Sequence, residues 1–273
     1  MQKNTIEIKG KTLSFLTKNE GPEKALLFVH GNSLSKDIFQ SQIESLAKTG
    51  AYCIAVDLPG HGESSKRLEN ESYSLDYYAE TLKDFCSILG LQKITFFGHS
   101  LAGHIGSHLF QKKPDLFEAL ITLATPPVSD VDSMGKAFHP HEALPSLVTG
   151  DLSSEQVEFL AKACLDSEMH VKEVSEMIVK TDPRTRDELG KSLVSGNFQN
   201  EIEILKNSNI AYLNIFSAND EIVSSEYIKS LPIFSLKNQK VTEVQSSHNA
   251  ILEDPDKVKV IIEDFLNGVG LSL

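Results

Sequence analysis

Short apolar segments that end in turn residues recur along the chain, and longer amphipathic segments separate them. Continuous apolar runs of this length are typical of strands buried on both faces, as in a parallel sheet. Apolar and polar residues alternate near the N-terminus instead, which predicts an antiparallel hairpin. The pattern therefore predicts strands at residues 5–9, 12–17, 25–29, 52–56, 94–97, 119–123, 210–216 and 241–245.

Apolar residues recur at helical spacing between most of these strands. Ser74 precedes one such segment and is a residue type that caps helix N-termini. Strands that alternate with helices fold as a mostly parallel, doubly wound α/β sheet. Helices are predicted at residues 37–48, 74–89, 101–111 and 250–265.

One connection is much longer than the others. No buried strand is evident between Leu123 and Ile210, whereas connections in compact domains are usually about 4–6 residues long. This interval carries helical patterns, which predict a helical cap at residues 126–205, inserted into a core domain of residues 1–125 and 206–273. The cap helices are expected at residues 153–165, 170–179 and 184–194.

Charge and length restrict the classes of partner. The 273 residues suit one large domain with an insertion, and the net charge of −12 would repel a phosphate backbone, so no nucleic-acid partner is expected. The chain has no apolar stretch long enough to span a membrane, and its N-terminus is polar. We therefore expect a cytoplasmic protein with no membrane partner. The three cysteines form no C-x-x-C pair and are expected to be buried thiols. The sequence leaves open whether the protein forms a homodimer.

A candidate nucleophile lies between a predicted strand and a predicted helix. The sequence Gly98-His-Ser-Leu-Ala-Gly103 follows the strand at 94–97 and opens the helix at 101–111. This is the context of a G-x-S-x-G elbow, although Ala102 stands at the second glycine and Gly103 follows it. Ser100 is therefore the predicted nucleophile.

A serine nucleophile needs a base, which in this architecture follows the last strand, with an acid before it. His248 follows the strand at 241–245 and is the predicted base. The acid should follow the strand at 210–216, where Asp220 holds the usual position. The adjacent and longer Glu221 remains the alternative acid.

The oxyanion of such a reaction needs two backbone N–H groups. We assign these to Leu101, directly after the nucleophile, and to Asn32, in the loop after the strand at 25–29. The side chain of Asn32 is a further candidate substrate contact, although it equally suits a turn. His104 and His108 are four residues apart, but no third ligand is evident, so no metal and no cofactor are expected.

Apolar residues of the predicted cap are candidates for holding the acyl part of a substrate. Core packing within the cap explains them equally well. They are Phe138, Leu144, Leu147 and Phe159.

The chain also carries a set of short motifs: His30-Gly-Asn-Ser-x-Ser35, Ile38-Phe39, Asp57-Leu-Pro-Gly-His-Gly62, Tyr73-Ser74, Tyr78-Ala79, Gly103-His-Ile-Gly106, Thr125-Pro-Pro-Val128 and Ile178-Val-Lys-Thr-Asp182. Together these motifs resemble the metal-independent N-acyl-homoserine lactonases of the α/β-hydrolase superfamily. The resemblance implies the opening of a homoserine lactone ring, and it places the acid at Glu221 and a lactone-contacting position at Leu160, where that group has tyrosine. At the elbow, His99 and Ala102 replace the tryptophan and glycine expected there.

The sequence thus predicts a serine hydrolase that cleaves an ester or lactone through an acyl-enzyme. A general carboxylesterase is one alternative. A carbon–carbon bond hydrolase is another, and it would need a cationic pocket, for which Arg184 and Arg186 are the obvious sources in the cap. A ligand-binding receptor of the same fold is the non-enzymatic alternative, against which the complete set of serine, acid and histidine argues.

Overall fold

The computed structural model describes residues 1–21 and 24–271 and contains an eight-stranded sheet with the order β1-β2-β4-β3-β5-β6-β7-β8. The hairpin of β1 and β2 pairs antiparallel to β4, and the remaining neighbours are parallel, as predicted. The central strands are buried along almost their whole length, which explains their continuous apolar runs. The strands are β1 Gln2–Ile8, β2 Lys11–Lys18, β3 Lys24–Val29, β4 Tyr52–Val56, β5 Lys93–His99, β6 Phe117–Leu123, β7 Ala211–Ser217 and β8 Gln239–Val244.

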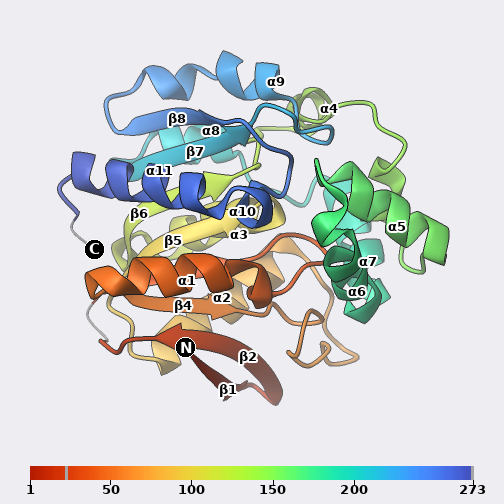
Figure 1. Cartoon of the computed structure of the whole chain (residues 1–273), viewed down its shortest axis with the longest axis horizontal. Coiled ribbons are helices and arrows are strands. Elements are labelled where there is room, and N and C mark those ends of the chain that lie inside the picture. Colours follow the sequence, from red (N-terminus) through yellow and green to blue (C-terminus); the bar gives the residue numbers. More distant parts are fainter. Residues whose placement is uncertain (22–23, 272–273) are drawn as a thin grey trace.

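Helices cover both faces of the sheet (Figure 1). One face carries α1 Gln40–Leu46, α10 Ala250–Glu253 and α11 Pro255–Gly268, and α1 packs against α11. The other face carries α2 Leu75–Ile88 and α3 Leu101–Lys112, which pack against each other. This arrangement confirms the predicted doubly wound α/β architecture.

Two predicted helices are interrupted. The segment 37–48 begins as a 3₁₀ helix at Lys36–Phe39 and ends as another at Ala47–Thr49. The segment 250–265 breaks at Asp254, because Pro255 has no N–H to continue the first helix and instead starts α11. The short helix α9 Ser225–Ser230 was not predicted, since six residues give too little periodicity to recognise.

The long connection between β6 and β7 is helical. It contains α4 Val131–Ala137, α5 Ser154–Ala163, α6 Val171–Lys180, α7 Pro183–Val194 and α8 Glu201–Lys206.

Helices α5, α6 and α7 lie together beside one end of the sheet (Figure 1), and we call these three helices with residues 144–150 the roof. The predicted cap range, 126–205, also includes most of α8, which packs against α3 and carries Leu205 into the core on that face. No helix within 1–21 and 24–271 has the length and apolar character needed to cross a membrane.

Candidate active site

The loops that follow the parallel strands meet at one edge of the sheet, because parallel strands all end on the same side. Ser100 follows β5, and the loops after β3, β7 and β8 carry Asn32, Asp220 and His248. The alternation of strands and helices thus brings together residues that are up to 216 positions apart in the sequence.

Ser100 lies in a strained turn between β5 and α3, with φ of 51° and ψ of −118°. Its N–H donates to the carbonyl of Leu123 at 2.8 Å, which ties the turn to β6. A Cβ on Gly98 would lie 2.6 Å from the backbone of Ala102, so only glycine allows the strand and helix to approach so closely. The predicted elbow is therefore present, and alanine at position 102 fits within it.

Gly103 also has a steric role. A Cβ at this position would lie 2.3 Å from Oγ1 of Thr125. That hydroxyl donates to the carbonyl of Ser100 at 2.7 Å and so fixes the turn from the side of β6. In the sequence, Thr125 was recognised only as part of a motif. Its position just after the predicted strand at 119–123 could have indicated a role at this edge of the sheet.

His248 connects Ser100 to a carboxylate. Its Nε2 lies 3.0 Å from Oγ of Ser100, and its Nδ1 lies 2.8 Å from Oδ2 of Asp220. With Nδ1–H donating to the carboxylate, Nε2 keeps a lone pair that faces the serine hydroxyl. The second oxygen of Asp220 accepts the N–H groups of Ile222 and Val223, each at 2.9 Å, which fixes the carboxylate.

Glu221 does not contact His248. Its side chain is 66% exposed and pairs with His141 at 3.3 Å, so the geometry favours Asp220 as the acid over the Glu221 that the resemblance implies. The pairing of the loop after β7 explains why Asp220, and not Glu221, faces His248. The N–H groups of Ala218 and Asn219 donate to the carbonyls of Val244, at the end of β8, and Ser246, just after it, and this pairing directs Asp220 inward and the next side chain outward.

The predicted oxyanion loop packs directly against the elbow. A Cβ on Gly31 would lie 2.9 Å from the ring of His99 and 3.1 Å from Cβ of Ser100, so glycine is required for this approach. Leu101 is the first residue of α3, where an N–H has no partner within the helix. The N–H groups of Asn32 and Leu101 have no hydrogen-bond acceptor in the described part of the chain, which leaves both available to a ligand.

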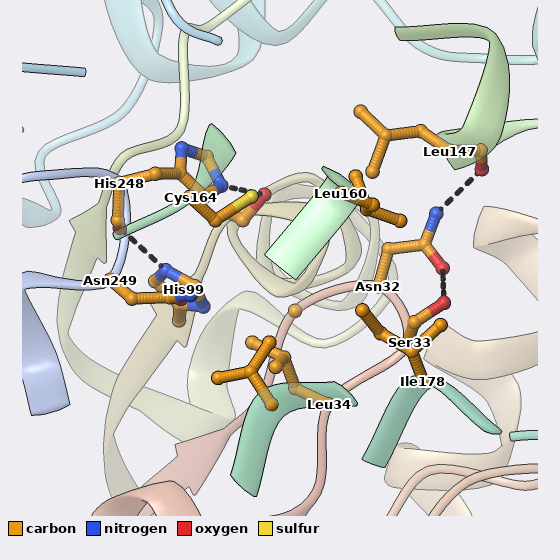
Figure 2. A pocket seen from close by; sticks show the side chains of 13 residues that line it. Asn32, Ser33, Leu34, His99, Leu147, Leu160, Cys164, Ile178, His248 and Asn249 are labelled. Carbon is orange, nitrogen blue, oxygen red and sulfur yellow. Dashed lines mark hydrogen bonds between the residues drawn. The ribbon is translucent and has the colours of Figure 1, made fainter. Parts of the chain in front are cut away.

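The side chain of Asn32 is held between the roof and its own loop. Its Nδ2 donates to the carbonyl of Leu147 at 2.8 Å, and its Oδ1 accepts the hydroxyl of Ser33 at 3.0 Å, as Figure 2 shows. Both bonds fix the orientation of the loop that carries the Asn32 N–H.

A cavity of about 30 Å³ adjoins Ser100, which is the volume of about one water molecule. The roof closes it with Leu147, Leu160 and Ile178 (Figure 2) and with Val174, and Cys164, directly after α5, adds to the same side. Ligand pockets are usually at least about 300 Å³, so the roof must shift before an acyl group can enter. The cavity is also lined by Gly31, Asn32, Ser33, Leu34, His99, Ser100, His248 and Asn249.

The predicted substrate contacts divide into two groups. Asn32, Leu147 and Leu160 line the cavity, whereas Phe138, Leu144 and Phe159 do not. Phe159 faces outward from α5, is 42% exposed and stacks on His141, and Phe138 pairs with Val223 beyond β7.

Phe138 and Leu144 pack against the apolar core, so packing overrides their expected role. The missed residues Val174 and Ile178 share one face of α6, and helical spacing was the signal that could have identified them.

Three buried histidines lie on the core side of the candidate site, and two of them hold its loops. Burial lowers the pKa of His30, His61 and His99 to about 3, so all three are neutral. His99 Nε2 donates to the carbonyl of His248 at 3.0 Å, and His30 Nδ1 donates to the carbonyl of Gly31 at 2.8 Å. Each thus holds a loop of the candidate site. The thiol of Cys164 stays protonated, because burial raises its pKa.

His104 and His108 do not form a metal pair. His104 Nδ1 contacts the carboxylate of Glu201 at 2.8 Å, and His108 Nδ1 contacts Asp76 at 3.0 Å. Each histidine therefore connects α3 to a different neighbouring helix.

The fold and the elbow agree with a comparison against known families. The sequence profile of the α/β-hydrolase fold family matches residues 24–255. The chain belongs to this family. The match covers most of the described sheet and the whole connection between β6 and β7.

Solved structures of known proteins have a similar fold. An N-acyl homoserine lactonase, AidH, complexed with N-butanoyl homoserine has a TM-score of 0.87 at 23% identity, over 97% of this chain and 96% of that one. A bromoperoxidase from Bacillus anthracis has a TM-score of 0.81 at 18% identity, over 97% and 100% of the two chains. At these identities the likeness shows the fold.

Two curated relatives differ in how much they share with the chain. The pimeloyl-[acyl-carrier protein] methyl ester esterase of Vibrio parahaemolyticus is 23% identical over 90% of this chain and 94% of its own length. The bifunctional epoxide hydrolase 2 of Sus scrofa is 34% identical over 43% of this chain. That match spans only 21% of the epoxide hydrolase. Esterases, lactonases and epoxide hydrolases thus share this α/β-hydrolase fold.

Proposed function

We propose that this α/β-hydrolase is a serine hydrolase that cleaves an ester or lactone carbonyl through an acyl-enzyme. The observation that carries the proposal is the continuous contact from Ser100 through His248 to Asp220 beside two unpaired N–H groups. A hydroxyl beside a neutral imidazole can lose its proton as it attacks a carbonyl carbon. Epoxide hydrolysis with a carboxylate nucleophile is disfavoured, because serine occupies the elbow.

The reaction follows from this geometry. Ser100 attacks the carbonyl carbon while its proton passes to Nε2 of His248, and Asp220 stabilises the resulting imidazolium. The N–H groups of Asn32 and Leu101 hold the tetrahedral oxyanion. The C–O bond then breaks, and the departing alcohol oxygen takes the proton from His248. A water molecule, deprotonated by the same imidazole, attacks the acyl-enzyme. The bond to Oγ of Ser100 then breaks, His248 returns the proton to Oγ, and the acid is released.

N-acyl homoserine lactones are the favoured substrate class within this proposal. The likeness to AidH extends over 97% of the chain, and the cavity beside Ser100 is roofed by apolar side chains, which suit an acyl chain. In a lactone the departing alcohol stays attached to the acyl group. Water must therefore compete with ring closure before the acyl-enzyme is hydrolysed.

The general carboxylesterase remains the second candidate, since the methyl ester esterase of Vibrio parahaemolyticus matches 90% of the chain. A carbon–carbon bond hydrolase is disfavoured, because the described cavity lining contains no lysine or arginine. Arg184 pairs with Asp182 at 2.6 Å, and the donors of Arg186 are taken up by protein acceptors.

Hydrolysis of p-nitrophenyl butyrate and of a panel of N-acyl homoserine lactones, with a chelator present, tests the proposal. Wild-type protein should hydrolyse the ester, and Ser100→Ala should lower kcat by about 10⁴-fold or more. Equal rates for the two proteins would refute the serine mechanism and favour the ligand-binding alternative. Turnover of esters without any lactone opening would favour the carboxylesterase.

A further inference from the structure

Arg186 is a buried cation close to the oxyanion loop. The residue lies on α7 of the roof and is 3% exposed. Its guanidinium donates to the carbonyls of Thr149 at 3.0 Å and Gly150 at 2.6 Å, and to the hydroxyl of Ser33 at 3.0 Å. All of these acceptors are neutral, and the carboxylates of Asp151 and Asp182 act on the guanidinium only through space, raising its pKa against the effect of burial. A buried charge is usually held by direct contact with an opposite charge, whereas Arg186 is held by neutral groups.

The bond to Ser33 continues into the candidate site. Ser33 accepts from Arg186 and donates its own hydroxyl to Oδ1 of Asn32, and Nδ2 of the same Asn32 side chain donates to the carbonyl of Leu147. Hydrogen bonds in a chain polarise one another in the same direction. The positive charge of Arg186 is therefore connected, through one hydroxyl, to the residue whose N–H faces the reacting carbonyl.

Ser33 also has a backbone conformation that needs support. Its φ is 60°, in the left-handed region that non-glycine residues rarely adopt. Its side chain is 1% exposed, so its hydroxyl depends on protein partners rather than water. The contact with Arg186 thus holds the turn that sets the direction of the neighbouring Asn32 N–H.

We propose that Arg186 is a positioning residue for the oxyanion. It acts through Ser33 and Asn32, holds the oxyanion loop in place, and favours negative charge at the tetrahedral intermediate. Because the roof supplies this cation, the oxyanion site is complete only when the roof is closed over the core. The inference rests on the proposed serine mechanism.

Three variants test this role by kcat and KM for p-nitrophenyl butyrate and by inhibition with butylboronic acid. The boronic acid forms a tetrahedral adduct on serine and so reports oxyanion binding. Ser33→Ala and Arg186→Met should each lower kcat by about 10- to 100-fold and weaken the inhibitor to a similar degree. KM should change little. The double variant should be no slower than Arg186→Met by more than about twofold, because both changes interrupt one chain of contacts.

Arg186→Lys should recover part of the rate, since it restores the charge without the planar geometry. A lysine variant as slow as Arg186→Met would overturn the role assigned to the charge. Lys191→Met, on the same helix and 73% exposed, is the matched control and should behave as wild type.

Folded Ser33→Ala with wild-type kcat and wild-type inhibitor affinity would overturn the whole inference, and this variant decides the matter if Arg186→Met does not fold. Ser100→Ala measured in parallel separates the two proposals. If it retains turnover, the serine mechanism fails. If it abolishes turnover while Ser33→Ala is unaffected, only the role of Arg186 fails.

Discussion

The core side and the roof side of the cavity are held in different ways. On the core side, Gly31, Gly98 and Gly103 allow backbone segments to approach so closely that a single Cβ would clash. On the roof side, apolar side chains such as Leu160 and Ile178 close the space, and a few hydrogen bonds attach the helices to the loops below. The comparison indicates that steric fit sets the backbone geometry of the site, whereas the apolar side chains of the roof bound the space beside Ser100.

Replacement of the acid should have the largest effect and tests whether the core alone sets the chemistry. Asp220→Asn keeps the shape of the side chain but removes the charge that orients and stabilises His248, so kcat should fall by about 10⁴-fold. Glu221→Gln is the matched control, because Glu221 lies at the surface, and its kcat should stay within about twofold. Steady-state kinetics of both variants on one ester shows which residue is the acid. A larger fall in kcat for Glu221→Gln than for Asp220→Asn would assign that role to Glu221.

Mild acid should lower the free energy of unfolding through three histidines that are buried in the core. The pKa of His30, His61 and His99 is about 3 in the folded protein, below the ordinary value of 6.5, so the unfolded chain binds more protons as pH falls. Stability is therefore complete above about pH 6.5 and is lost progressively down to about pH 3. Each histidine contributes about 1.4 kcal/mol per pH unit, and the three together about 4 kcal/mol per unit.

Urea unfolding at several pH values between 5 and 7.5 measures this dependence. His61→Asn removes one titrating group and should reduce the slope by about one third. A pH slope that is the same in wild type and variant would show that this histidine is not the source.

The sequence predicted the core much better than the roof. Segments 94–97 and 119–123 are recognisable because burial on both faces demands continuous apolar residues, and Ser100 and His248 follow from their positions after strands. The choice between Asp220 and Glu221 depends on backbone pairing between two loops, which leaves no mark on the residue pattern.

The roof residues were harder to assign for a different reason. Leu160 and Phe159 are adjacent on one helix, and a rotation of about 100° per residue places one in the cavity and the other at the surface. Only the packing of α5 against its neighbours determines which residue faces the site. The sequence identified Arg186 as a positive charge in the cap. The spacing of residues along the chain does not predict that this charge is buried beside Ser33.

A methyl group on Gly31 tests the steric fit on the core side. Gly31→Ala would push the oxyanion loop away from His99 and Ser100, and displacement of one N–H donor should lower kcat by about 10²-fold. Gly135→Ala, in a helix of the cap where a Cβ meets no atom within 4 Å, is the control and should leave kcat unchanged. Wild-type kcat in a folded Gly31→Ala protein would show that the loop has more freedom than the contacts indicate.

A change in an apolar side chain of the roof should have the smallest effect on rate and should act on specificity instead. Leu160 is 2% exposed and lines the cavity, so Leu160→Ala should make room for a longer acyl chain. One methylene in an apolar pocket changes discrimination by about 1–3 kcal/mol. The ratio of kcat/KM for p-nitrophenyl hexanoate to that for the butyrate should therefore rise about tenfold, while kcat for the butyrate changes little.

Val179→Ala, on an exposed face of α6, should leave that ratio as in wild type. If Leu160→Ala instead lowers kcat for both esters equally and leaves their ratio unchanged, Leu160 is part of the reaction geometry. The assignment of the roof's apolar side chains to selection of the acyl chain would then be wrong, because a side chain more than 50 residues from the elbow in sequence would be orienting the carbonyl itself.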